Sequence, residues 1–264
     1  MEISQIKKLL EEFGDNVRFE HDLKKKNWFN IGGKSKVFYK ANNLKELVIF
    51  LKKLNNREKI FILGAGSNTL ISDNLFDGVV IKLSKNFNNV SLLGEDIIIA
   101  GSAVLDKSIS DFALNNNLSG FEFLTCIPGT IGGGIRMNAG CFGKEFKDIL
   151  LSIQAIDKSG NILTIPAKEI KFEYRKNDLS EDLIFLSASF KGVKSSYKKI
   201  NNTKLSFSNI LIFEFTKFSA NFLIIIPKAT GTVTTKNIFS AIPVIEIFWD
   251  IFVIPNKSAD VKII

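Results

Sequence analysis

The strongest constraint on the fold is a stretch of nearly bare backbone, LTCIPGTIGGGIRMNAG at residues 124–140. Its five glycines and Pro128 make it unsuitable for a helix interior or a central strand. Apolar residues flank the stretch, as they would a buried segment. We therefore expect a buried loop whose glycines leave room for a ligand, because a Cβ atom would collide with it.

Composition limits the class of protein. A chain of 264 residues is long enough for a large core and two or three subdomains. It is 45% apolar and 23% charged, which is typical of a globular protein. The net charge of +8 would suit an anionic partner such as a nucleotide or a nucleic acid. The lysines are scattered, however, which favours biased codon usage as the cause and predicts no nucleic-acid partner.

Several features predict a cytoplasmic protein without membrane insertion or metal. The first residues, MEISQIKKLLEEFG, lack the apolar core of a signal peptide. The most apolar window, residues 211–226, is interrupted by Glu214 and Lys217. The two cysteines, Cys126 and Cys141, make neither a disulfide framework nor a zinc site.

The single histidine limits the available chemistry. His21 lies in a polar stretch, and we expect a solvated surface residue rather than a base. This disfavours Ser-His-Asp and Cys-His catalysis and histidine-rich metal sites. A catalyst would have to use Arg, Glu, Ser, Tyr, Lys or a cofactor.

Apolar spacing predicts an irregular alternation of helices and strands. The expected helices cover 3–13, 44–54 and 106–117. The expected strands cover 36–40, 59–63, 78–83, 96–101 and 182–190, with a hairpin at 151–166. Because there is no regular βαβ rhythm, we predict an α+β fold rather than a doubly wound sheet.

The pattern changes after about residue 200. Residues 207–264 contain one glycine, Gly231, and no arginine, and their apolar residues follow neither strand nor helix periodicity. One interpretation is an ordinary apolar β subdomain. The other is a segment whose reading frame has been lost, because a shifted frame keeps base composition and destroys binary patterning.

A second glycine-rich loop, LGAGSNTLI at residues 63–71, directly follows the predicted strand KIFI. Its glycines permit positive φ and close approach of a ligand, and its backbone N–H groups can form a nest for phosphate oxygens. The loop has no G-K-[ST] ending, and Thr69 stands where a Rossmann fingerprint needs Gly or Ala. The predicted pyrophosphate contacts are Gly64, Ala65, Gly66, Ser67 and Asn68.

Together the two loops suit a flavin dinucleotide, which has a pyrophosphate and a broad planar ring. We expect both loops to face one cleft, with FAD as the cofactor, and Gly66→Val to abolish its binding. The predicted contacts from the 124–140 stretch are Pro128, Gly129, Thr130, Gly133 and Asn138.

Four strings carry a resemblance to a known family. They are NWFNIGG (27–33), LGAGSNTLI (63–71), GFEFLTCIPGTIGGGIRMNAGCFG (120–143) and FEYRK (172–176). In order and spacing they resemble the UDP-N-acetylenolpyruvoylglucosamine reductase family, also called UDP-N-acetylmuramate dehydrogenase. The resemblance covers roughly residues 1–195. It implies a two-subdomain FAD-binding fold of the vanillyl-alcohol-oxidase type in 1–195, followed in 196–264 by a degenerate or truncated substrate-binding subdomain.

The resemblance also implies a reaction in peptidoglycan precursor synthesis. NADPH would reduce FAD, which would reduce the enolpyruvyl group of a UDP-sugar to give UDP-N-acetylmuramate. Developing negative charge then needs a fixed cation. Arg175 matches the family arginine and is the predicted catalytic residue, and Tyr174 with Arg175 is predicted to bind substrate.

Other family features are missing from this sequence. The serine proton donor and the late glutamate have no clear match, and Thr232 and Glu246 are only faint counterparts. Cys126 stands where the family usually has glycine, and Asn177 where it usually has serine. Three interpretations stay open: an active reductase, a degraded or frame-shifted member that binds FAD without full catalysis, and a flavin-binding redox module with another substrate. The sequence does not predict the oligomeric state.

Overall fold

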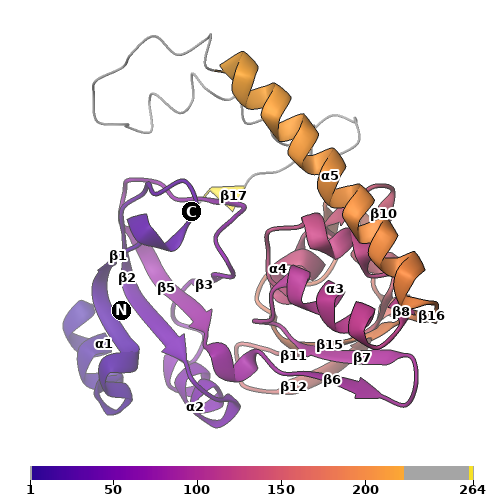
Figure 1. Cartoon of the computed structure of the whole chain (residues 1–264). Coiled ribbons are helices and arrows are strands. Elements are labelled where there is room, and N and C mark those ends of the chain that lie inside the picture. The colour runs from indigo at the N-terminus through magenta and orange to yellow at the C-terminus, as the bar shows by residue number, and fades with distance from the viewer. Residues whose placement is uncertain (1, 223–261, 264) are drawn as a thin grey trace.

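The structure is a computed structural model that describes residues 2–222 and 262–263. It has two lobes, each of which combines a sheet with helices (Figure 1). This confirms the predicted α+β fold with two subdomains. Thr232 and Glu246 lie outside the described residues, as do the apolar runs that follow residue 222.

The first lobe is a four-stranded sheet flanked by two helices. Its helices and strands are α1 (Ile3–Leu9), β1 (Val17–Asp22), β2 (Lys34–Ala41), α2 (Leu44–Leu54), β3 (Ile60–Ile62), β4 (Thr69–Leu70) and β5 (Phe76–Leu83). The strand order is β1–β2–β5–β3, antiparallel between β1 and β2 and parallel elsewhere. Tyr39 stacks on Phe50 in its core, with ring centroids 3.8 Å apart. The short strand β17 (Lys262–Ile263) pairs in parallel with β4.

The second lobe is a five-stranded antiparallel sheet covered by helices. Its longer elements are β6 (Val90–Leu93), β7 (Ile97–Gly101), α3 (Asp106–Asn115), α4 (Ile131–Arg136), β11 (Leu150–Ile156), β12 (Ile162–Pro166) and β15 (Ile184–Lys191). The strand order is β12–β11–β15–β7–β6. Helix α4 packs against β15 and β7, so the glycine-rich stretch lies directly on this sheet.

Short elements connect these layers. The short strands of the second lobe are β8 (Leu118–Ser119), β9 (Gly140–Cys141), β10 (Lys144–Glu145), β13 (Phe172–Glu173), β14 (Lys176–Asn177) and β16 (Val193–Lys194). The 3-10 helices are η1 (Glu11–Asn16), η2 (Lys24–Lys26), η3 (Lys85–Phe87), η4 (Glu122–Cys126), η5 (Phe146–Asp148) and η6 (Ala167–Glu169).

Helix α5 (Tyr197–Phe222) begins just after the predicted boundary at residue 195 and packs against η4 and α3 (Figure 1). Ile200 is buried, and the ring of Phe207 stacks on that of Phe142 at 4.3 Å. Lys204 is buried and forms an ion pair with Asp111 at 2.6 Å. The first turns of α5 therefore complete the surface of the second lobe.

Most of the elements expected from apolar spacing are present, because their patterns match burial. Helix α2 covers the predicted residues, starts with the Asn43 side chain accepting from the Glu46 N–H, and ends at left-handed Asn55. The first helix is shorter than expected: α1 stops at Leu9 and the chain continues as a 3-10 helix. Strand β1 was not predicted.

The expectation that residues 124–140 avoid helical structure is wrong. Ile131–Arg136 form α4, with three consecutive glycines inside the helix. The glycines suit the protein's own neighbours: a Cβ on Gly134 would lie 2.3 Å from the Phe146 ring, and one on Gly132 would lie 3.0 Å from Ser102 Cβ. Close packing therefore overrides the low helix propensity of glycine. At Gly132 and Gly134, contacts within the protein explain the lack of a side chain, and the expected ligand is not needed to explain it.

His21 also differs from the expectation of a solvated residue. Its ring centroid lies 4.6 Å from that of Phe38, and its Nε2 atom is buried without a hydrogen-bond partner among the described residues. Burial, and then Lys26 and Arg18, lower the pKa of this histidine. We infer a neutral ring packed on β2.

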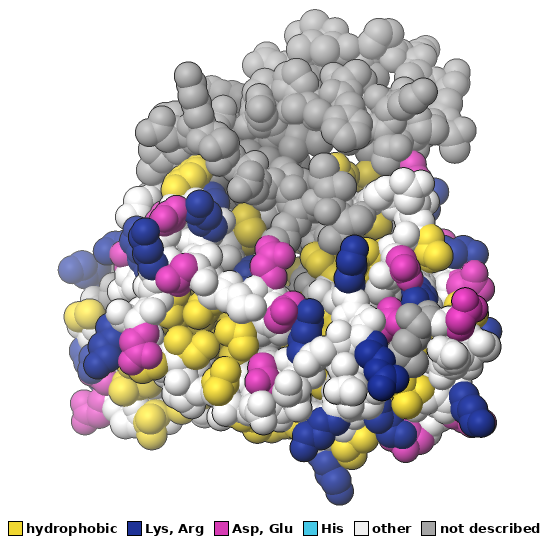
Figure 2. All heavy atoms as spheres, turned by 180° about the vertical axis from the view of Figure 1, so that it is seen from behind, with side chains coloured by type: hydrophobic (Ala, Val, Ile, Leu, Met, Phe, Trp, Pro, Cys, Tyr) yellow, Lys and Arg dark blue, Asp and Glu magenta, His cyan; other side chains and the backbone are white. Residues whose placement is uncertain are grey.

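Figure 2 shows Lys and Arg side chains interspersed with Asp and Glu side chains over one face of the molecule. This arrangement agrees with the scattered lysines of the sequence. Among the described residues, no helix is both long and apolar enough to span a membrane.

Two neighbouring glycines of α4 test the packing argument. We expect Gly134→Ala to lower the free energy of unfolding by about 1–3 kcal/mol, because the added methyl meets the buried Phe146 ring. Gly133→Ala should be neutral or stabilise by up to about 1 kcal/mol, since its nearest neighbour is Thr130 Oγ1 at 3.6 Å. Urea unfolding of the FAD-free protein measures both, and equal effects would contradict the argument.

Candidate cofactor and catalytic site

The structure brings the two glycine-rich loops together. A Cβ built on Gly64 would lie 2.8 Å from Thr130 Oγ1, so the loop after β3 touches the residue that precedes α4. These residues come from different lobes and are far apart in sequence. The two loops therefore lie next to each other at the junction of the lobes, and that both face one cleft stays a prediction.

Gly66 is required by its backbone. Its φ is +73°, and a Cβ would lie 2.3 Å from the Lys26 carbonyl oxygen, while the Trp28 N–H donates to the Gly66 carbonyl at 3.0 Å. Gly66→Val would therefore distort the loop itself, which differs from the sequence-based reason that a side chain would fill a phosphate nest. Next to Gly66, Ser67 and Asn68 are half-buried.

A lysine that the sequence analysis missed lies beside this loop. Lys82, near the end of β5, is half-buried and donates from Nζ to the Gly64 carbonyl at 3.0 Å. Burial, and then the charge of Lys26, lower the pKa of Lys82. Two cations near one loop are unfavourable without an anion. In the sequence, the position of this lysine directly after the apolar run GVVI could have identified it as a candidate site residue.

The 124–140 stretch exposes some predicted residues and buries others. Pro128 and Gly133 are exposed and Gly129 is half-buried. Thr130 is buried, and its hydroxyl does not cap α4, so it faces Gly64 instead. The surface available at this loop thus comes from Pro128, Gly129 and Gly133.

Asp106, the first residue of α3, is fully buried behind Gly129. Its N–H donates to the Gly129 carbonyl at 3.2 Å, and a Cβ on Gly129 would lie 2.6 Å from its carboxyl Oδ2. Neither carboxyl oxygen has a hydrogen-bond partner among residues 2–222. Burial raises the pKa of Asp106 well above its usual value. This carboxyl also escaped the sequence analysis, because its charge suggested exposure.

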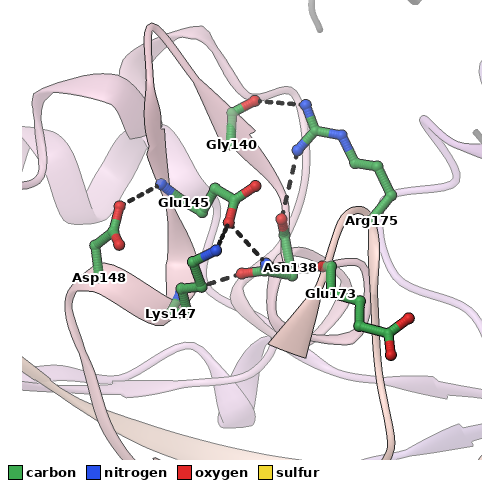
Figure 3. A network of polar contacts seen from close by, with 7 residues as sticks. All are labelled: Asn138, Gly140, Glu145, Lys147, Asp148, Glu173 and Arg175. Atoms are coloured by element: carbon green, nitrogen blue, oxygen red, sulfur yellow. Dashed lines mark hydrogen bonds and ion pairs between the residues drawn. The ribbon is translucent and has the colours of Figure 1, made fainter. Parts of the chain in front are cut away.

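Asn138 is fully buried, and its side chain forms hydrogen bonds within the protein (Figure 3). Its Nδ2 donates to Glu145 Oε2 at 3.0 Å and to the Glu173 carbonyl at 3.1 Å, and its Oδ1 accepts from the Lys147 N–H at 3.1 Å. The amide therefore connects the end of α4 to the β13–β14 hairpin. A direct contact with the cofactor stays a prediction.

Arg175 lies in the two-residue turn between β13 and β14, with φ of +58°. Its guanidinium donates to the Asn138 carbonyl at 3.4 Å and to the Gly140 carbonyl at 3.0 Å (Figure 3). Its Nε is buried without a partner among the described residues, and its Cζ lies 5.1 Å from the centre of the half-exposed Tyr174 ring. The predicted catalytic cation is therefore held at the end of the 124–140 stretch.

A second arginine fixes the same region. Arg136, at the end of α4, donates to the carbonyls of Leu179, Ser180 and Leu183 at 3.1, 3.0 and 2.7 Å. Its Cζ lies 4.2 Å from the Phe185 ring centroid, and burial lowers its pKa to about 10. The sequence analysis did not single it out. Its bonds to carbonyls indicate a structural role.

The positive-φ glycine loop thus lies beside Lys82, and the buried Arg175 lies at the far end of the 124–140 stretch. This combination can hold an anionic cofactor and a substrate carboxylate. No group of three or more His, Cys, Asp or Glu side chains that could hold a metal occurs in the part of the chain that the structure describes.

Comparison with known proteins shows what this chain resembles. Residues 35–166 match the family model described as FAD binding domain. The chain is 64% identical over 205 residues to UDP-N-acetylenolpyruvoylglucosamine reductase of Pelagibacter ubique, covering 78% of this chain and 68% of that protein. It is 45% identical over 194 residues to the protein of the same name from Rickettsia typhi, covering 71% and 65%.

The fold is similar to the crystal structure of UDP-N-acetylenolpyruvylglucosamine reductase from Thermus caldophilus. The TM-score is 0.64 at 26% identity, and the match covers 73% of this chain and 69% of that chain. The chain thus spans only about two thirds of the length of the relatives that it matches.

Asp106 predicts an unusual pH dependence of stability. A raised pKa in the folded state means that the folded protein holds a proton that the unfolded chain releases above about pH 4. Stability should then fall as pH rises, by up to about 1.4 kcal/mol per pH unit for this one proton, until the folded-state pKa is passed. Asp106→Asn cannot ionise, so its stability relative to wild type should rise from pH 4 to pH 7.

Urea unfolding at several pH values tests this. Asp157→Asn is the contrasting control, because backbone and side-chain hydrogen bonds from Asn161 and its neighbours lower the pKa of Asp157. The free energy of unfolding of Asp157→Asn, relative to that of the wild type, should fall as pH rises over the acidic range. A flat difference between Asp106→Asn and wild type would show that Asp106 ionises without penalty in the folded protein.

Proposed function

Because the chain belongs to the UDP-N-acetylenolpyruvoylglucosamine reductase family, we propose that it binds FAD where its two glycine-rich loops meet. The reaction it serves is the NADPH-driven reduction of UDP-N-acetylglucosamine enolpyruvate to UDP-N-acetylmuramate, in the cytoplasm. The observation that carries this proposal is the contact of Gly64 with Thr130, beside Lys82. This contact places the two loops that are predicted to bind the cofactor next to each other.

The residues at this junction fit the charge and shape of FAD. Gly66 has the positive φ that a phosphate nest uses, and Ser67 and Asn68 follow it with polar side chains. Lys82 and Lys26 supply the positive charge that a pyrophosphate needs. The exposed backbone at Pro128 and Gly133 leaves room for the rest of the cofactor.

FAD, when bound, supplies the two-electron carrier between NADPH and the enolpyruvyl group. Arg175 would hold the substrate carboxylate and stabilise the negative charge that develops on it, because a guanidinium stays charged and binds carboxylates in bidentate fashion. Its buried Nε has no partner among the described residues, and its ring neighbour Tyr174 is half-exposed at the same turn.

Because the chain matches only part of the length of its relatives, we infer that it carries out only part of the family reaction. The aligned region covers 68% and 65% of the two bacterial relatives, and residues 207–264 lack the family's serine and glutamate motifs. We propose that residues 1–195 form the FAD-binding region, and that the proton donor for the final step is missing. The chain would then accept electrons from NADPH without completing the reaction.

Lys82→Gln tests the cofactor site. The amide can still donate to the Gly64 carbonyl but carries no charge, so we expect the Kd for FAD to rise about tenfold. Binding of riboflavin, which has no phosphate, should be unchanged. Fluorescence titration measures both ligands.

Lys59→Gln is the matched control, because Lys59 is exposed at the opposite end of β3 from the loop. It should bind FAD like the wild type. Equal losses of FAD and riboflavin affinity in Lys82→Gln would indicate loop distortion rather than lost charge and would contradict the assignment.

The two half-reactions should separate in the wild-type chain. We expect anaerobic stopped-flow absorbance to show flavin reduction by NADPH, which depends mainly on cofactor geometry. Formation of UDP-N-acetylmuramate should be slower than in a full-length relative by a factor of about 10²–10⁴, the usual cost of losing a general acid. Arg175→Lys should leave the flavin reduction rate within a few-fold of wild type.

Product chromatography with the enolpyruvyl substrate follows the second half-reaction. Rapid product formation would overturn the proposal of an incomplete reaction and would make Thr232 and Glu246 the first residues to replace. Failure of NADPH to reduce bound flavin would instead contradict the proposed use of FAD.

A further inference from the structure

The two cysteines of the chain lie at the two ends of the glycine-rich stretch. Cys126 is the last residue of η4 and lies near the start of that stretch, two residues before Pro128, and Cys141 is the last residue of β9 and directly follows the stretch. Cys126 also stands at a position where the sequence analysis noted a departure from the family pattern. The flavin chemistry proposed above uses neither thiol.

The fold brings these two cysteines together. The elements that carry them, η4 and β9, pack against each other, and both side chains belong to the core of the second lobe. Cys126 is 3% exposed and Cys141 is 8% exposed, and neither is in a disulfide. The interaction between the two side chains lowers the pKa of Cys126 and raises that of Cys141.

We propose that Cys126 and Cys141 form a redox-sensitive pair that hydrogen peroxide converts to a disulfide, closing residues 126–141 into a covalent loop. The thiolate of Cys126 attacks one peroxide oxygen, and the O–O bond breaks with release of hydroxide, which takes up a proton to become water. The product is a sulfenic acid on Cys126. The thiol of Cys141 then attacks the Cys126 sulfur, an S–S bond forms, and a second water leaves.

The asymmetry between the thiols assigns their order. The thiolate is the reactive species, and Cys126 is the cysteine whose thiolate the interaction with its neighbour favours. Cys141 stays protonated beside it and provides the resolving thiol. Peroxide therefore attacks Cys126 first.

The disulfide would fix the segment that carries Pro128, Gly129 and Thr130 at one end. At the other end it would fix Gly140, whose carbonyl accepts from Arg175 at 3.0 Å. Oxidation would thus restrain both sides of the candidate site without adding a group to it. A closed loop of about 15 residues restricts the unfolded chain, so the oxidised protein should be more stable.

Peptide mapping of the full chain tests the proposal directly. Trypsin cleaves after Lys107, Arg136 and Lys144, which places the two cysteines in separate peptides, 108–136 and 137–144. After peroxide treatment and a block of free thiols, mass spectrometry should find these peptides joined, with the loss of two hydrogen atoms, and separate again after dithiothreitol. The thermal midpoint should rise by roughly 6–12 °C and return on reduction.

Single serine variants provide the controls. Cys141→Ser should stop at a sulfenic acid on Cys126 that dimedone traps, and Cys126→Ser should give neither the linked peptides nor the thermal shift. The wild-type map needs no variant to fold, so it decides the matter alone. Separate peptides carrying independently oxidised cysteines, or a disulfide between two molecules, would overturn the proposal.

Discussion

The Asn138 amide is the interaction on which the arrangement of the site depends. It is fully buried, and its hydrogen bonds to Glu145, Glu173 and Lys147 join three segments. Its own carbonyl accepts from Arg175. Because an unsatisfied buried amide is costly, these segments are held in one relative position. The location of the candidate catalytic cation thus follows from a structural amide, and Arg136 adds a second fixed connection to the same region through carbonyls after β14.

Glycine in this protein serves the packing of the chain at least as much as ligand binding. Gly134 lets the Phe146 ring approach α4, and Gly66 allows the 26–28 segment to cross its loop. Gly133 is the glycine of α4 that is exposed and where an added Cβ would make only an ordinary contact, with Thr130 Oγ1 at 3.6 Å. The ligand therefore meets a surface whose shape was already set by close internal contacts. This explains why bare backbone occurs in a region with a dense core beneath it.

Local patterns predicted the parts of the fold that depend on local physics. The spacing of Leu47, Leu51 and Leu54 located α2, and the glycine-rich strings indicated the two loops that meet at the lobe junction. Helix α4 was missed because its formation depends on tertiary contacts that outweigh propensity. Lys82 and Asp106 were missed for a related reason: their environments are created by residues distant in sequence, and a charge in a sequence gives no sign of burial.

The first turns of α5 pack against the second lobe and extend its core. Ile200 and Phe207 cover η4 and Phe142, and Lys204 neutralises Asp111 at the same surface. Burying the apolar side chains of Ile200 and Phe207 stabilises this edge of the lobe by about 25 cal/mol for each Å² of apolar surface removed from water. Helix α5 therefore packs against the second lobe and starts two residues after residue 195, the predicted boundary. On the proposed function, cofactor binding would depend on contacts within the two lobes, and completion of the reaction on groups outside them.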